Sequence, residues 1–200
     1  MIRSSQNIYF VDDEPAVRRA ASRTLSRLGC RVSCFSDAQE CLSRLKDHSC
    51  NLLITDVKMP GMNGIDLVKE AKRIIPWLPV LVITGYGDIP MAVRAVKAGA
   101  ADFIEKPLEW KSFLSSAEAA LEKYDPENLM KGKKLTRTEM IVLRFILHGK
   151  SNKDIARIQH RSIRTVEDHR RNIMRKFNVD NPVDLVKKAA SMGFLVFDQR

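Results

Sequence analysis

Five short apolar runs, each followed by a longer segment with helical spacing, restrict the fold of the first 124 residues more than any other feature of the sequence. The runs cover residues 8–11, 31–35, 52–55, 80–84 and 102–104. Strands that alternate with helices pair in parallel, and right-handed crossovers then place helices over both faces of the sheet. The pattern predicts an α/β doubly wound domain with a five-stranded parallel sheet.

Polar residues stand at the ends of four of these predicted strands. Asp12 and Asp13 follow the first strand, Asp56 follows the third, Thr84 ends the fourth, and Lys106 comes soon after the fifth. In parallel α/β sheets, ligands bind at the carboxyl ends of the strands, near the point where the strand order reverses. Acidic residues at such ends commonly just cap the next helix, but their occurrence together at successive strand ends indicates a shared site.

The chemistry of this set suits phosphoryl transfer to a carboxylate. Three carboxylates gathered in one place repel one another and favour a divalent cation, and oxygen ligands favour Mg²⁺ over zinc. Asp56 would be the nucleophile, Lys106 would pair with the phosphoryl oxygens, and Thr84 would donate a hydrogen bond. The sequence has no Walker-type loop, GxGxxG motif or kinase signature, so the phosphodonor is expected to be another molecule.

The sequence changes character after residue 124. Residues 125–134, DPENLMKGKK, are polar and predict a linker between a domain of residues 1–124 and a domain of residues 135–200. The second domain reads as all-α, with four helices and no strands. The residues predicted to cap these helices are Thr136, with capping-box spacing to Glu139, Ser151, Ser162 and Asn181. The third helix is expected to bury Ile163, Val166, Ile173 and Phe177.

Positive charge is concentrated in the second domain. The formal net charge is +10, and residues 131–200 hold 17 Lys and Arg against 7 Asp and Glu, so the remainder is neutral. A compact basic segment favours a polyanionic partner, nucleic acid first and a membrane surface second. An exposed face of the predicted third helix carries Arg164, Glu167, Asp168, Arg171 and Arg175. Such a face can enter the major groove of DNA, or it can be a solvated surface crossed by salt bridges.

The cysteines and the hydropathy pattern indicate a cytoplasmic protein. The four cysteines, at positions 30, 34, 41 and 50, lack CxxC and zinc-finger spacing, so reduced and mostly packed thiols are expected. No stretch approaches the roughly 20 apolar residues that span a bilayer. The first residues also lack the apolar stretch of a secretory signal. No membrane partner is therefore expected.

Residues 7–122 resemble the receiver domain of bacterial response regulators. The pair Asp12-Asp13 carries the resemblance, together with the segments ITDVKMPGMNG (54–64), VITGYGD (82–88) and KAGAADFIEKP (97–107). The resemblance implies that Asp56 is the phosphoacceptor. It also implies that Asp13, Asp56 and the backbone carbonyl of Lys58 bind Mg²⁺, while Asp12 acts largely through water.

Further roles follow from the same resemblance. Thr84 and Phe103 match the switch pair, in which the hydroxyl moves toward the phosphoryl group and the aromatic ring turns inward. Lys58 and Tyr86 match the positions that tune the lifetime of the acyl phosphate. The Lys106-Pro107 bond is expected to be cis. The implied phosphodonor is a sensor histidine kinase.

Residues 135–192 resemble the LuxR-type helix-turn-helix of the NarL/FixJ class. The matching pieces include SNKDIA (151–156) and the pattern S-x-x-T-V-x-x-H (162–169). The resemblance makes residues 154–158 the scaffold helix, 162–177 the recognition helix and 182–192 the dimerisation helix. The implied base contacts are Glu167, Asp168 and Arg171, the implied phosphate contacts are Asn152, Lys153, Thr165 and Arg175, and Arg164 lies on the same face. One departure is the turn, where Gln159 and Arg161 replace apolar residues.

These features together predict a two-component response regulator rather than an enzyme, with at most slow self-dephosphorylation. Phosphorylation of Asp56 is expected to favour homodimers that bind a two-fold-related site on double-stranded DNA and control transcription. RNA polymerase is a further partner to consider. Three alternatives stay open: a constitutive DNA-binding regulator with a silent receiver, a small phosphatase of similar α/β design, and a signalling adaptor whose C-terminal domain binds protein.

Overall fold

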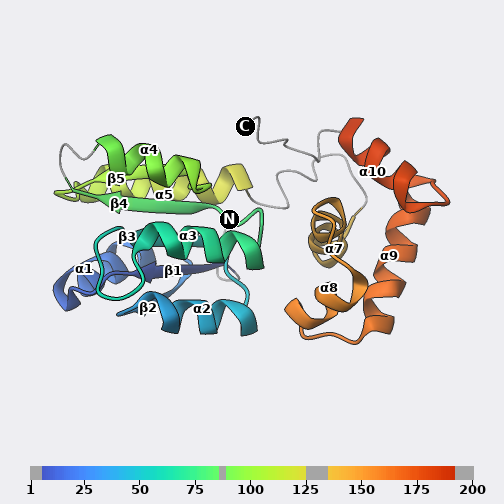
Figure 1. The fold of residues 1–200 in the computed structure, drawn as a ribbon, viewed down its shortest axis with the longest axis horizontal. Helices are drawn as coiled ribbons and strands as arrows, with labels where there is room; N and C mark the ends of the chain where they lie inside the picture. Colours follow the sequence, from blue (N-terminus) through green and yellow to red (C-terminus); the bar gives the residue numbers. More distant parts are fainter. Residues whose placement is uncertain (1–5, 86–88, 125–134, 192–200) are drawn as a thin grey trace. The chain divides into compact units, whose positions relative to one another are not determined.

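The computed structural model describes residues 6–85, 89–124 and 135–191 (Figure 1). The chain divides into two compact units, Met1–Tyr124 and Asp125–Arg200. The predicted linker, residues 125–134, lies outside the described residues. Within the described residues, no helix combines the length and the apolar character that crossing a membrane requires.

The first unit is a five-stranded parallel sheet flanked by helices, which confirms the predicted fold class. Its strands are β1 (Asn7–Val11), β2 (Arg31–Phe35), β3 (Leu52–Asp56), β4 (Val80–Thr84) and β5 (Asp102–Glu105). Its helices are α1 (Pro15–Leu25), the 3₁₀ turn η1 (Ser26–Leu28), α2 (Ala38–Asp47), α3 (Gly64–Ile74), α4 (Ile89–Lys97) and α5 (Trp110–Tyr124). The strands lie in the order β2-β1-β3-β4-β5, so the succession reverses direction at β1. The carboxyl ends of β1 and β3 therefore flank the switch point where such sheets bind ligands.

Alternate residues of each strand face opposite layers of helices. Ile8 and Phe10 of β1 belong to a core cluster with α1 and α5, whereas Tyr9 and Val11 belong to a cluster with α2, α3 and α4. Figure 1 shows these helices over the two faces of the sheet. All residues of the central strands β3 and β4 are buried, because helices cover both faces.

The second unit is helical, as predicted for an all-α domain. Its helices are α7 (Arg137–Leu147), α8 (Asn152–Ile158), α9 (Ile163–Phe177) and α10 (Pro182–Ser191). The predicted caps are confirmed: Thr136 and Ser151 form capping boxes, and Ser162 and Asn181 accept hydrogen bonds from backbone N–H groups of α9 and α10. The core is formed by apolar residues from all four helices, including Leu143, Phe145, Ile155, Ile173 and Leu185.

The apolar face of α9 begins one turn later than predicted. Val166, Ile173 and Phe177 are buried, but Ile163 is 47% exposed. Ile163 is the first residue of α9, so helical spacing alone placed it on the buried side although it stands at the end of the helix. The turn before it contains Gln159 and Arg161, which are half-buried and exposed, and is closed by a hydrogen bond from Arg161 N–H to the Ala156 carbonyl oxygen.

Candidate functional site

The carboxyl ends of β1 and β3 bring two buried carboxylates close to the side-chain ammonium group of Lys106. Asp12 follows β1 and is fully buried, and Asp56 ends β3 and is 4% exposed. Lys106 Nζ lies 3.0 Å from Asp56 Oδ1 and 3.6 Å from Asp12 Oδ2. The exposed Glu14 carboxylate lies 3.7 Å from the same nitrogen. The fold thus joins Lys106 to carboxylates that stand 50 to 94 positions before it in the sequence.

The charges in this pocket shift two pKa values. Burial raises the pKa of the Asp12 carboxyl, and the hydrogen bond from Glu14 N–H and the charge of Lys106 offset this only in part. Burial by itself lowers the pKa of Lys106, but the hydrogen bond to Asp56 and the charges of Asp56, Asp12 and Glu14 outweigh it and leave the pKa raised. Lys106 is therefore a cation at neutral pH.

Two buried oxygens of the pocket lack a hydrogen-bond partner within the described part of the chain. They are Asp12 Oδ2 and Thr84 Oγ1. Thr84 ends β4, next to the strand that ends in Asp56. Because buried polar atoms are nearly always satisfied, a site with one orphaned acceptor and one orphaned hydroxyl has the chemistry to receive a polar ligand.

The oxygen ligands around Asp56 suit a hard cation. Lys58 N–H donates to Asp56 Oδ2 at 2.9 Å, which fixes the carboxylate beside the Lys58 peptide, and Asp13 is exposed at the end of β1. Among the described residues, no three His, Cys, Asp or Glu side chains are gathered as a ready-made metal cluster. Two carboxylates, a backbone carbonyl and water are, however, a set that Mg²⁺ accepts. The residues present therefore fit Mg²⁺.

Gly64 allows the chain to pass close to Asp56. A Cβ at this position would lie 2.0 Å from the Asp56 carbonyl oxygen. Gly64 N–H also donates to the Val57 carbonyl oxygen at 3.0 Å. The start of α3 thus packs directly on the backbone of the β3 end, and any side chain there would displace it.

A surface hollow of the first unit has Thr84 and Phe103 among its lining residues. This hollow of about 360 Å³ is lined by Thr84, Ala92, Val93, Val96, Lys97, Phe103 and Glu105. The Phe103 side chain is 43% exposed, so its ring lies at the surface in this structure. The Lys106-Pro107 peptide bond is cis, as expected. Tyr86 lies outside the described residues.

The predicted DNA-reading face of α9 is exposed along its length. Arg164, Glu167, Asp168, Arg171 and Arg175 are all solvent-accessible. Arg171 pairs with Asp168 at 3.0 Å, and Arg175 donates to Asn172 Oδ1 at 3.2 Å. Surface pairs of this kind contribute little, so the guanidinium groups can exchange these partners for others.

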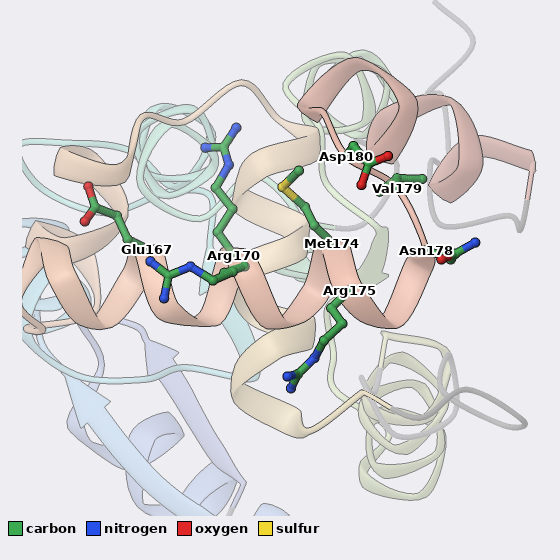
Figure 2. Close-up of a pocket in the computed structure, with 8 residues that line it drawn as sticks. Glu167, Arg170, Met174, Arg175, Asn178, Val179 and Asp180 are labelled. Atoms are coloured by element: carbon green, nitrogen blue, oxygen red, sulfur yellow. The ribbon is translucent and has the colours of Figure 1, made fainter.

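A hollow of about 520 Å³ lies beside α9 and the segment that leads to α10. It is lined by Glu167, Arg170, Arg171, Met174, Arg175, Asn178, Val179 and Asp180. Figure 2 shows the side chains of Glu167 and Arg175, two of these lining residues, projecting from α9. Three arginines against two carboxylates leave this surface positive, which suits a polyanion.

A hydrogen bond that the sequence did not predict connects the N-terminus of α8 to α9. Arg170 Nη1 of α9 donates to Asn152 Oδ1 of α8 at 2.9 Å. Lys153 is exposed, and Thr165 Oγ1 shares a hydrogen bond of 2.8 Å with Ser162 Oγ. Arg170 lies one position away from the predicted reading face, so the helical spacing of exposed arginines gave no signal for it.

Comparison with known proteins assigns both units. Residues 8–118 match the model of the response regulator receiver domain, and residues 133–189 match the bacterial regulatory proteins of the luxR family. The response regulator protein TodT of Pseudomonas putida is 40% identical over 190 residues, covering 90% of this chain and 83% of TodT. The transcriptional regulatory protein FixJ of Bradyrhizobium diazoefficiens is 36% identical over 198 residues, covering 94% of this chain and 97% of FixJ.

Solved structures agree with this assignment. Full-length FixJ from B. japonicum matches with a TM-score of 0.58 and 35% identity, over 96% of this chain and 99% of that chain. The response regulator StyR matches with a TM-score of 0.54 and 34% identity, over 93% of this chain and 98% of that one. Receiver domains typically bind Mg²⁺ and receive their phosphoryl group from a histidine kinase, and the luxR-family domain binds DNA. The chain therefore belongs to the two-component response regulators of the NarL/FixJ class, which join a receiver domain to a LuxR-type DNA-binding domain.

Proposed function

We propose that this response regulator accepts a phosphoryl group on Asp56 and that the modification switches the binding of its second unit to double-stranded DNA. The observation that carries the proposal is the pocket at the ends of β1 and β3, where Lys106 Nζ lies 3.0 Å from Asp56 Oδ1 beside the buried Asp12. A cation held against a carboxylate that can act as a nucleophile is what phosphoryl transfer needs.

The reaction replaces a P–N bond of the donor with a P–O bond to Asp56. A carboxylate oxygen of Asp56 bonds to the phosphorus of a phosphohistidine on the sensor kinase, the P–N bond breaks, and the imidazole leaves with the electron pair. Lys106 pairs with the phosphoryl oxygens, because its raised pKa keeps it charged. The orphaned Thr84 hydroxyl donates to the product, and the exposed Phe103 ring turns inward as the hydroxyl moves.

The cation site uses oxygen ligands from the same strand ends. Asp13, Asp56 and the Lys58 carbonyl would hold Mg²⁺, with Asp12 acting through water. Bound Mg²⁺ supplies charge screening for the phosphoryl oxygens. Turnover by the protein is at most slow loss of the phosphoryl group to water, with Lys58 and Tyr86 tuning its rate.

The second unit reads DNA with α9 and holds the phosphates with α8 and its surroundings. Glu167, Asp168 and Arg171 meet base edges, and Arg164 lies on the same face. Residues that contact phosphates are Asn152, Lys153, Thr165 and Arg175. Phosphorylation favours homodimers through α10, and the dimer binds half-sites about one helical turn apart and can recruit RNA polymerase. This proposal places the protein in the cytoplasm, where the kinase and the chromosome are both accessible.

The test compares wild type with Asp56→Asn before and after treatment with acetyl phosphate and Mg²⁺. We expect mass spectrometry to find one phosphoryl group on wild type and none on the variant, because the amide is not a nucleophile. Gel shift and sedimentation should show tighter DNA binding and dimers only for treated wild type. Labelling without any change in DNA binding would indicate a silent receiver, and release of phosphate over many turnovers would indicate a phosphatase.

A further inference from the structure

One arginine holds the backbone of both acidic residues that follow β1. Arg18 lies in α1, and its Nη1 donates to the Asp12 carbonyl oxygen at 2.7 Å and to the Asp13 carbonyl oxygen at 2.9 Å. A guanidinium Nη carries two hydrogens, so a single nitrogen can serve both acceptors. The side chain is half-buried, and the bond to Asp12 is partly shielded from water, whereas the bond to Asp13 is exposed.

Apart from Pro15 at its first position, the start of α1 lacks the usual means of ordering such a loop. The residue at the N-cap position, Glu14, makes no side-chain capping hydrogen bond, and the first turn contains no acidic residue. A further side-chain hydrogen bond in this loop runs from Glu14 N–H to Asp12 Oδ1 at 2.8 Å. The carbonyls of Asp12 and Asp13 therefore depend on Arg18 for protein partners within the described residues.

We propose that Arg18 is a positioning residue for the Mg²⁺ site: it fixes the main chain at Asp12 and Asp13 so that the two carboxylates project toward Asp56. This inference rests on the proposed function, because it concerns the cation that Asp13 and Asp56 hold there. The bonds of the Arg18 side chain go to the two carbonyl oxygens, and Arg18 is not among the residues proposed to hold the cation or the phosphoryl group. Its contribution is the orientation of the groups that do, and removal of such a supporting partner typically lowers metal affinity by 10- to 100-fold.

Positioning and charge predict opposite results at this residue. Arg18 is a cation beside a site for another cation, so a purely electrostatic role means that its removal tightens Mg²⁺ binding. A positioning role means that its removal weakens Mg²⁺ binding. Lysine keeps the charge, but its Nζ stands one bond nearer the backbone than Arg18 Nη1 and so falls short of the two carbonyls, which lets Arg18→Lys separate the two effects.

The experiment is isothermal titration of Mg²⁺ into the full-length protein, at a temperature well below the thermal midpoint of every variant. The test variants are Arg18→Met and Arg18→Lys, which are compared with wild type. Asp13→Asn removes one proposed Mg²⁺ ligand, and Arg19→Met is the matched control. Arg19 is the exposed neighbour on the same helix, so its variant removes the same charge near the site without touching the loop. We expect both Arg18 variants to bind Mg²⁺ about tenfold or more weakly than wild type, and Arg19→Met to match wild type within about twofold.

Other outcomes overturn the proposal in distinguishable ways. If Arg18→Met binds Mg²⁺ as tightly as wild type or more tightly while Asp13→Asn loses binding, the cation site stands and the role of Arg18 is wrong. If wild type binds no Mg²⁺, the proposed cation site fails and the role of Arg18 fails with it. If Arg18→Met does not fold, Arg18→Lys decides alone, and wild-type affinity in that variant rejects the proposal.

Discussion

Two buried threonines on neighbouring strands differ in whether their hydroxyl groups have a partner. Thr55 Oγ1 of β3 donates to the Asp56 carbonyl oxygen at 2.9 Å, whereas Thr84 Oγ1 of β4 has no partner within the described part of the chain. Both side chains are almost completely buried. The two positions therefore form a matched pair for measuring what an orphaned hydroxyl costs.

We predict that Thr84→Val leaves the free energy of unfolding unchanged or raises it by up to about 1 kcal/mol, because valine removes an unsatisfied buried group. Thr55→Val should lower the free energy of unfolding by about 1 kcal/mol, because it breaks a hydrogen bond. Urea unfolding followed by tryptophan fluorescence measures both, since Trp77 and Trp110 both lie in the receiver. Equal losses in the two variants would mean that the Thr84 hydroxyl is already satisfied in the unphosphorylated protein.

At the scale of elements, one buried carboxylate both caps α7 and ties it to α9. Glu139 Oε2 accepts from Thr136 N–H at 2.7 Å and from Lys176 Nζ at 2.7 Å. Burial by itself raises the pKa of Glu139, but the bonds from Lys176 and Thr136 outweigh it and hold the pKa below its usual value of 4.5. Glu139 therefore caps the start of α7 and also connects α7 to α9 through Lys176.

The lowered pKa gives the sign of a pH effect. A carboxyl group with a lowered pKa in the folded state stabilises the fold above its unfolded pKa, near 4.5, and this stability is lost as the pH falls through the folded value. Lys176→Met should therefore lower the stability of the second unit by about 1–3 kcal/mol at neutral pH and by less at about pH 4. Far-ultraviolet circular dichroism during urea unfolding measures this loss, with tryptophan fluorescence identifying the receiver transition. An equal loss at both pH values would contradict the role of the ion pair.

The hydrogen bond between Arg170 and Asn152 links α9 to the start of α8. Asn152 uses its Oδ1 atom to accept from Arg170, which leaves the amide NH₂ as the group that can donate to a phosphate. We predict that Arg170→Met weakens specific DNA binding by roughly tenfold, because a hydrogen bond to a charged group is worth about 1.5–3 kcal/mol.

The matched control for this prediction is Arg157→Met. Arg157 belongs to α8, and its side chain is 80% exposed and paired only with Asp154 among the bonds described for it, at 3.2 Å. This variant removes the same charge from the same domain without loosening the two helices. The measurement is fluorescence anisotropy with a labelled operator at fixed salt. Equal losses for the two variants would assign the effect to charge alone.

At the scale of the whole molecule, the two parts of the chain differ in net charge. Residues 131–200 carry the entire net charge of +10, and the rest of the chain is neutral. A neutral receiver neither attracts nor repels DNA at long range, so the basic half alone should set the salt dependence of binding.

We predict that Lys153→Ala weakens binding to specific and random DNA alike and reduces the slope of log K against log salt by about 1, because it removes one phosphate contact. Arg171→Ala should instead reduce the preference for the specific site by about 1–3 kcal/mol. Lys111→Ala, an exposed lysine of the receiver helix α5, should change neither quantity. Filter binding over a range of salt concentrations separates the three. A slope unchanged by Lys153→Ala would remove it from the phosphate contacts.

Much of the fold was predictable because its signals are local. The bounds of the five strands differ from the predicted runs by one residue at most, and the caps Thr136, Ser151, Ser162 and Asn181 begin the helices they were expected to begin. Alternation of apolar residues and capping depend on neighbours within a few positions, so the sequence carries them directly. The order of polar residues at strand ends likewise indicated which side chains could meet.

What the sequence determined by itself was therefore the two folds, the family and the positions of the polar residues along the strand ends. Only the tertiary structure decided which partners those residues have: Arg18 on the carbonyls of Asp12 and Asp13, Arg170 on Asn152 and Lys176 on Glu139. It also decided that Ile163 is exposed and that the Phe103 ring lies at the surface. Contacts of long side chains depend on the packing and crossing of whole elements and on which rotamers that packing leaves free, and no local pattern encodes them.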